Sequence, residues 1–173
     1  MSRRERNGIH RWSLALLAAL AGTACVGGQD LAVPDADTVE SYYSYGGGLE
    51  AVVDGNVATL TVTQSADQLR RGGRLWAKVG PYVVLFTEET WRLFEDHPGL
   101  AGVRVVTELE GGPEVARALL RRDALTGVLW RRSLNIAGRA RRDGTEQVTL
   151  IEKLIEWGED RTDFEYNPRY TRR

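Results

Sequence analysis

The sequence of 173 residues has few of the side chains that build disulfides or soft metal sites, with one Cys and two His. A single Cys excludes an intrachain disulfide framework, and a structural zinc site needs several thiolate or imidazole ligands. The 23 basic and 24 acidic residues nearly cancel, which argues against a nucleic-acid binder that relies on a basic surface. We therefore expect no metal, no cofactor and no nucleic-acid partner.

The chain also lacks an apolar run long enough to span a bilayer. Its longest such run, residues 12–24, has 13 residues, whereas a membrane-spanning helix needs about 20. Four arginines precede this run within residues 1–11, and small residues follow it. A basic segment, a short apolar segment and a small-residue segment, in that order, are typical of an export signal peptide. We expect residues 1–24 to be this signal.

The only cysteine follows the small residues directly, in the segment Ala21-Gly22-Thr23-Ala24-Cys25. This segment resembles the lipobox of bacterial lipoprotein precursors, which ends in Ala or Gly before a lipidated Cys. The resemblance covers the first 25 residues and implies two or more acyl chains on Cys25, enough for stable anchoring. It also implies outer-membrane sorting, because Val26 rather than Asp follows the Cys. The alternative is ordinary signal cleavage before Cys25, which would leave a free thiol.

Residues 26–48 are mostly Gly, Asp, Ser and Tyr and close on three glycines, which predicts a flexible spacer. Tyr42, Tyr43 and Tyr45 within it form either a patch that stacks on a ligand or a first edge strand docked on the domain. The expected organisation is a signal at 1–24, a lipidated Cys and tether at 25–48, and one domain at 49–173.

Alternating apolar residues predict a β-hairpin over residues 49–63, with its turn at Asp54-Gly55-Asn56. Residues 75–86 are predicted to be a strand interrupted at Gly80-Pro81, because that pair is more natural at a bulge or edge. Thr87 then caps an expected helix over 88–96, and residues 103–109 form another expected strand.

The C-terminal half is predicted to be mostly helical. Residues 114–125 follow Pro113 and are rich in Ala and Leu, which favours a helix over the alternative of a returning hairpin strand. Residues 128–142 form a firmer predicted helix with Trp130 facing inward. Thr149 and Glu152 match a capping box at the start of a last helix to residue 157. The expected fold class is α+β, with a small antiparallel or mixed β-sheet packed against C-terminal helices.

Catalytic groups are scarce in this sequence. His97 is the only His after the signal, and its place before Pro98-Gly99 is that of a residue ending a helix. No Gly-x-Ser-x-Gly elbow and no phosphate-binding or dinucleotide-binding glycine pattern is present. Acidic pairs from different elements leave no local signature, so carboxylate chemistry stays open at three places. These are Glu88-Glu89, Glu95-Asp96 and Glu108-Glu110.

One charge pattern carries a hypothesis, because residues 117–142 hold eight Arg against the single acid Asp123, and acids dominate residues 143–165. Two interpretations compete: the two segments pair within the fold, or the Arg face meets an anionic partner such as lipid headgroups or an acidic glycan. A face that is merely solvated is the third. The residues expected to face outward on one helix are Arg131, Arg132, Arg139 and Arg142.

These observations predict a lipid-anchored protein of a bacterial cell envelope, held through Cys25 on the outer membrane and facing the periplasm. Its expected role is that of a noncatalytic interaction or accessory module at the membrane surface, with the membrane and an envelope protein or anionic lipid or glycan as partners. The alternative is an envelope enzyme, or a protein that binds a small ligand or glycan, using carboxylates. No catalytic residue is assigned.

Overall fold

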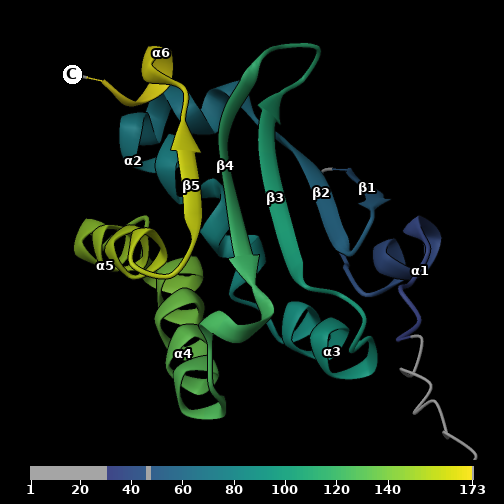
Figure 1. Ribbon diagram of the computed structural model, residues 1–173. Coiled ribbons are helices and arrows are strands. Elements are labelled where there is room, and N and C mark those ends of the chain that lie inside the picture. Colours follow the sequence, from purple (N-terminus) through teal and green to yellow (C-terminus); the bar gives the residue numbers. More distant parts are fainter. Residues whose placement is uncertain (1–30, 46–47, 173) are drawn as a thin grey trace, which may run out of the picture.

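The computed structural model describes residues 31–45 and 48–172, which form one five-stranded sheet with helices packed on one of its faces (Figure 1). The prediction of an α+β fold is confirmed. The strands are β1 (Leu49–Asp54), β2 (Val57–Gln64), β3 (Gly102–Leu109), β4 (Glu114–Arg121) and β5 (Asp163–Tyr166). The helices are α1 (Ala36–Ser41), α2 (Ala66–Leu85), α3 (Glu88–Asp96), the 3₁₀ turn η1 (Arg122–Ala124), α4 (Gly127–Asp143), α5 (Val148–Glu159) and α6 (Pro168–Thr171).

The five strands lie side by side in chain order, and the sheet is mixed. β2 and β3 are parallel, whereas every other neighbouring pair is antiparallel. Parallel neighbours need a long crossover, which α2 and α3 supply between β2 and β3. α2 contacts β2, β3 and β4, and α5 packs against both α2 and α4. The helical layer is therefore built on α2.

Alternate residues of β2 show which face of the sheet the helices cover. Ala58, Leu60, Val62 and Gln64 are buried, and the residues between them are half-buried. The predicted hairpin is confirmed, since β1 and β2 pair in antiparallel register from Leu49 with Val62 to Asp54 with Val57. Its two-residue turn needs a positive φ, which Gly55 adopts at 58°.

The prediction of a strand over residues 75–86 is wrong, because this segment is the C-terminal part of helix α2. Its apolar run is buried along several sides: Val79 and Tyr82 are fully buried, and Tyr82 packs closely on Gly158 of α5. A helix covered on two sides has the same continuous apolar pattern as a buried strand. Pro81 lies inside the helix.

Residues 70–74 lie within α2, where Gly73 interrupts the helical backbone with φ 57° and ψ −148°. That conformation is open to Gly and strained for other residues. Gly73 therefore separates a short exposed turn of helix from the buried part of α2.

Residues 114–121 form strand β4, so the favoured helix prediction for 114–125 is wrong and the returning hairpin strand is observed. β4 pairs with β3 from Gly102 opposite Arg121 to Glu108 opposite Glu114. Val115, Ala116, Ala118 and Leu120 are buried in this pairing. Pairing on two sides outweighs the helix propensity of Ala and Leu, because tertiary context overrides a weak local preference.

The predicted helices over 88–96, 128–142 and 149–157 are confirmed as α3, α4 and α5. The Thr87 side chain accepts a hydrogen bond from the Thr90 backbone N–H, as expected of a cap. The predicted capping box is wrong, because the N-cap of α5 is Gln147, two residues before Thr149, and it makes no side-chain cap hydrogen bond.

Part of the segment expected to be a spacer is folded onto the domain. α1 lies beside β1 (Figure 1), its Val39 is fully buried, and the Glu40 carboxylate accepts a hydrogen bond from the Ala51 N–H at 2.7 Å. Tyr43 donates to or accepts from Thr90 of α3 at 3.0 Å. The ordered fold thus begins before Leu49, with a helix where the sequence predicted a spacer or an edge strand.

Among the described residues, the hydrophobic core cluster and its partly buried neighbours lie between Ala36 and Tyr166. The five strands and the helices packed on them all lie within residues 36–171. We therefore expect the chain from residue 26 onward to fold by itself.

Candidate functional site

The predicted lipid attachment site, Cys25, lies outside the described residues. Among the residues that are described, no helix is both long and apolar enough to cross a bilayer. The other predicted site residues, those of the Arg-rich segment, all lie within the described part of the chain.

The four arginines expected to face outward do so, on one side of α4. Arg131, Arg132, Arg139 and Arg142 are all exposed, and we call them the α4 basic face. At 100° per residue they fall within about a third of the helix circumference. Val128, one of the most exposed large apolar side chains at 66%, lies on the same side. The helix therefore presents a cationic stripe that ends beside an apolar residue.

The α4 basic face is not neutralised by α5. If the two segments paired within the fold through these helices, ion pairs would join α4 to the acids of α5. Among the described residues no ion pair joins α4 to Glu152, Glu156 or Glu159. Arg142 contacts its neighbour Asp143 at 3.2 Å, and the Arg132 guanidinium lies 4.6 Å from the centre of the Trp157 ring. A second pair joins the basic and acidic segments outside α4, between Arg117 of β4 and Glu165 of β5, with an Nε–Oε2 distance of 3.1 Å.

Two other arginines of the segment have a structural role. Arg122 donates to the carbonyl oxygens of Phe94, His97 and Leu100, at and just after the end of α3. Arg141 donates to the carbonyl of Val83, at 2.8 Å, near the end of α2. Cations at helix C-termini satisfy carbonyls that lack an intrahelical partner. Partial burial lowers the pKa of both guanidinium groups.

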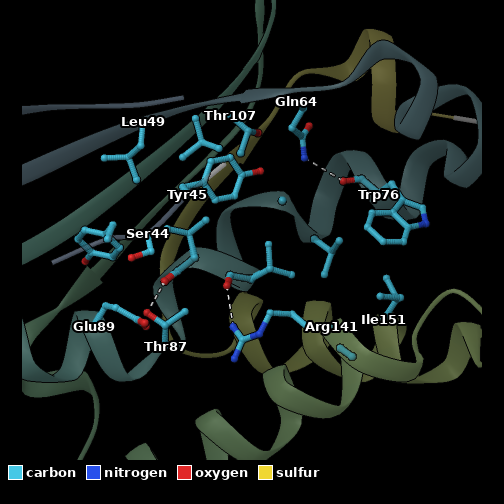
Figure 2. A pocket seen from close by; sticks show the side chains of 17 residues that line it. Ser44, Tyr45, Leu49, Gln64, Trp76, Thr87, Glu89, Thr107, Arg141 and Ile151 are labelled. Atoms are coloured by element: carbon cyan, nitrogen blue, oxygen red, sulfur yellow. Dashed lines mark hydrogen bonds between the residues drawn. The ribbon is translucent and has the colours of Figure 1, made fainter. Parts of the chain in front are cut away.

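A cavity lies between the helix-covered face of the sheet and α2 (Figure 2), with a volume of about 500 Å³. We call it the sheet–helix pocket. Its lining residues come from residues 43–45, β1, β2, α2, the start of α3, β3, the end of α4 and α5. They are Tyr43, Ser44, Tyr45, Leu49, Val62, Gln64, Trp76, Val79, Gly80, Val83, Val84, Thr87, Glu89, Thr107, Ala140, Arg141 and Ile151.

Tyr42, Tyr43 and Tyr45 do not form the single stacking patch considered from the sequence. The Tyr42 hydroxyl donates a hydrogen bond to the Asp96 carboxylate at 2.8 Å and lies 3.2 Å from Nε2 of His97. Tyr42 and His97 therefore belong to the contact between the ends of α1 and α3. Tyr43 and Tyr45 line the sheet–helix pocket, and burial raises the pKa of each phenol. In Figure 2 the Tyr45 hydroxyl points toward the side of the cavity where Gln64 lies.

The candidate carboxylates are dispersed over the fold. Glu89 lines the sheet–helix pocket, Glu88 pairs with Arg92 at 3.3 Å, and Asp96 bonds to Tyr42. Glu108 is on the opposite face of β3 from the buried Thr107. Within the described residues no group of three or more His, Cys, Asp and Glu is placed to hold a metal ion.

Sequence reasoning missed Gln64, the polar residue on the buried register of β2. The signal was present, because Gln64 continues the buried series Ala58, Leu60 and Val62 at the same spacing of two. A polar side chain at an inward position of an otherwise apolar series marks either a satisfied network or a binding site. Arg141, by contrast, had no local signal that separated it from its neighbour Arg142.

Comparisons of the chain with protein-family models, with curated proteins and with solved structures find no match.

Proposed function

We propose that this protein is a lipid-anchored module of a bacterial cell envelope, attached through Cys25, that acts without catalysis by docking the α4 basic face on anionic headgroups. The observation that carries the proposal is this face: four exposed arginines on one side of α4, none of which is paired with an acid of α5 among the described residues. Arg142 contacts Asp143, whereas Arg131, Arg132 and Arg139 form no ion pair with any described residue and are available to a partner.

The anchor determines which anionic surface is within reach. Eight residues, and so nine Cα–Cα steps, lie between Cys25 and Pro34, the first buried residue of the described chain. At about 3.3 to 3.6 Å per residue, such a segment spans at most roughly 30 Å. A protein acylated at Cys25 therefore holds its domain beside the bilayer, where each Arg near an anionic surface contributes about 1 kcal/mol. The outer membrane is the proposed location.

Acylation is tested in cells by metabolic labelling with a fatty-acid analogue. The wild-type chain is expected to take the label, and Cys25→Ser is expected to remain unlabelled because the thioether has no sulfur to form on. Equal labelling of the two chains contradicts the anchor.

The docking surface is tested with residues 26–173 and vesicles of phosphatidylglycerol and phosphatidylcholine, in a sedimentation assay. Replacing all four arginines of the α4 basic face by Gln is expected to weaken binding by about 100-fold or more at low salt. The melting temperature is expected to remain within a few degrees, since exposed ion pairs contribute about 0 to 1 kcal/mol each.

The matched control removes the same charge elsewhere, by replacing Arg70, Arg71, Arg74 and Arg92 with Gln; all four are exposed. This variant is expected to bind within about threefold of the wild type, because these side chains are outside the α4 basic face. Equal losses in the two quadruple variants would show that net charge alone acts. Wild-type protein that ignores anionic vesicles at low salt rejects the proposal.

A further inference from the structure

Gln64, one of the residues that line the sheet–helix pocket, has a buried side-chain atom without a hydrogen-bond partner. Gln64 is only 9% exposed, and its amide nitrogen donates to the Trp76 carbonyl oxygen at 3.4 Å. This bond orients the amide, so that Oε1 is the remaining acceptor. Oε1 is buried and has no hydrogen-bond donor among the described residues.

Glycine at position 80 makes room for this amide. A Cβ built on Gly80 would come within 2.2 Å of the Gln64 amide nitrogen and within 3.0 Å of the Thr107 methyl. Any larger residue would displace the Gln64 side chain. α2 therefore packs close to the sheet at Gly80, which leaves room for the Gln64 amide beside Thr107.

An unpaired buried carbonyl is costly, since leaving one unsatisfied costs about 1 to 3 kcal/mol. Thr107 does not relieve it, because its hydroxyl donates to the Ala116 carbonyl oxygen at 3.1 Å. Leu at position 64 would continue the apolar series without this cost. Gln64 is one of the residues that line the cavity, and the acceptor left unpaired on its side chain can receive a donor from a ligand.

The rest of the pocket is suited to an apolar molecule. Its walls include Leu49, Val62, Val79, Val83 and Ile151, with the Trp76 and Tyr45 rings at its sides. A volume of about 500 Å³ falls in the range of small-molecule sites, which combine apolar walls with a few polar groups. The charged groups, Arg141 and Glu89, belong to the end of α4 and the start of α3 (Figure 2).

We propose that the sheet–helix pocket is a binding site for a small, largely apolar molecule that bears a hydroxyl or amide N–H and donates this hydrogen to Gln64 Oε1. Contact with the apolar walls stabilises any bound molecule of suitable shape, because the hydrophobic effect is not directional. The unpaired acceptor favours molecules that carry a hydrogen-bond donor. An ether or ester of the same shape leaves Oε1 unpaired and binds more weakly. This site is separate from the α4 basic face and does not depend on its function.

The test compares β-naphthol, which carries a hydroxyl donor, with its methyl ether, which does not, by calorimetric titration of residues 26–173. The wild-type protein is expected to bind β-naphthol at least about tenfold more tightly than the ether. In Gln64→Leu the two affinities are expected to become equal within about twofold, because the acceptor is gone while the apolar walls remain.

The control is Gln147→Leu, the same substitution at an exposed residue outside the pocket, which is expected to keep the wild-type preference. Gln64→Met, a flexible side chain of similar volume, gives the same comparison if the Leu variant does not melt cooperatively. Equal wild-type affinities for the two compounds, or a preference that persists without Gln64, overturns the proposal. Failure of cooperatively folded wild-type protein to bind either compound overturns it as well.

Discussion

The two faces of helix α4 contain very different residues and meet very different surroundings. On the inner face Trp130 stacks on Trp91, with the ring centroids 6.2 Å apart and an angle of 9° between the ring planes. Ala137 and Ala140 on the same face are buried. On the outer face lie four exposed arginines and Val128. A periodicity of 3.6 residues lets one helix carry both sets without conflict.

This difference shows how one helix can separate stability from recognition. The inner side chains have partners within the fold, so their replacement changes the free energy of unfolding. Among the described residues the outer arginines have only two exposed contacts, Arg132 over Trp157 and Arg142 beside Asp143. Their replacement is therefore expected to leave the fold intact and to change what the surface attracts. Three pairs of substitutions test this separation.

The largest effect is expected from Trp130→Ala, which removes a side chain that is 4% exposed and packs on Trp91 and Phe94. Truncating a buried aromatic leaves a cavity and costs about 3 to 5 kcal/mol of unfolding free energy. Chemical denaturation measures it. Val128→Ala on the outer face is the counterpart, expected to change stability by less than about 0.5 kcal/mol. Similar losses for the two would erase the distinction between the faces.

A smaller loss is expected from Ser133→Ala. The Ser133 hydroxyl accepts a hydrogen bond from the Trp157 indole N–H at 2.8 Å, and both residues are buried. Losing the acceptor leaves a buried donor unsatisfied and costs about 1 to 3 kcal/mol. A double-mutant cycle with Trp157→Phe isolates this bond, since the second substitution should cost less once its partner is gone. Strict additivity would show that the bond contributes nothing.

The smallest effect is expected at the boundary between the two faces. Arg141→Met removes the donor to Val83 at the end of α2 and is expected to cost about 1 kcal/mol. Arg142→Met, one residue further on, removes only an exposed contact with Asp143 and is expected to cost less than about 0.5 kcal/mol. Thermal melts of the two variants provide the comparison, which fails if Arg142→Met is the more damaging.

Local sequence signals predicted the elements that begin or end at a turn or cap residue, or whose apolar residues recur at a regular spacing. The β1–β2 hairpin follows from alternation on both sides of Asp54-Gly55-Asn56, and α3 follows from the Thr87 cap. α4 follows from the spacing of Trp130, Ala137 and the outward arginines. In each case the information lies within a few residues of where it acts.

The wrong predictions fall where long-range contacts decide. The strand prediction for residues 75–86 fails because the apolar run of this part of α2 is buried against the sheet and α5 together. The helix prediction for residues 114–125 fails because the strands that pair with β4 are set by the fold and not by local sequence. Nothing near Arg122 or Arg141 indicates that each binds the carbonyls of another helix.

By itself, the sequence determined the α+β class, the hairpin, the C-terminal helices and the outward direction of the α4 basic face, because periodicity and turn chemistry act locally. Only the tertiary structure decided which arginines have partners and where the sheet–helix pocket forms. A cavity and an ion pair each require side chains from several elements to meet, and that meeting depends on how α2 packs on the sheet. Gln64 depends on both the local sequence and the tertiary structure. The alternation of buried residues along β2 turns its side chain inward, and the packing around it leaves its carbonyl oxygen without a hydrogen-bond partner.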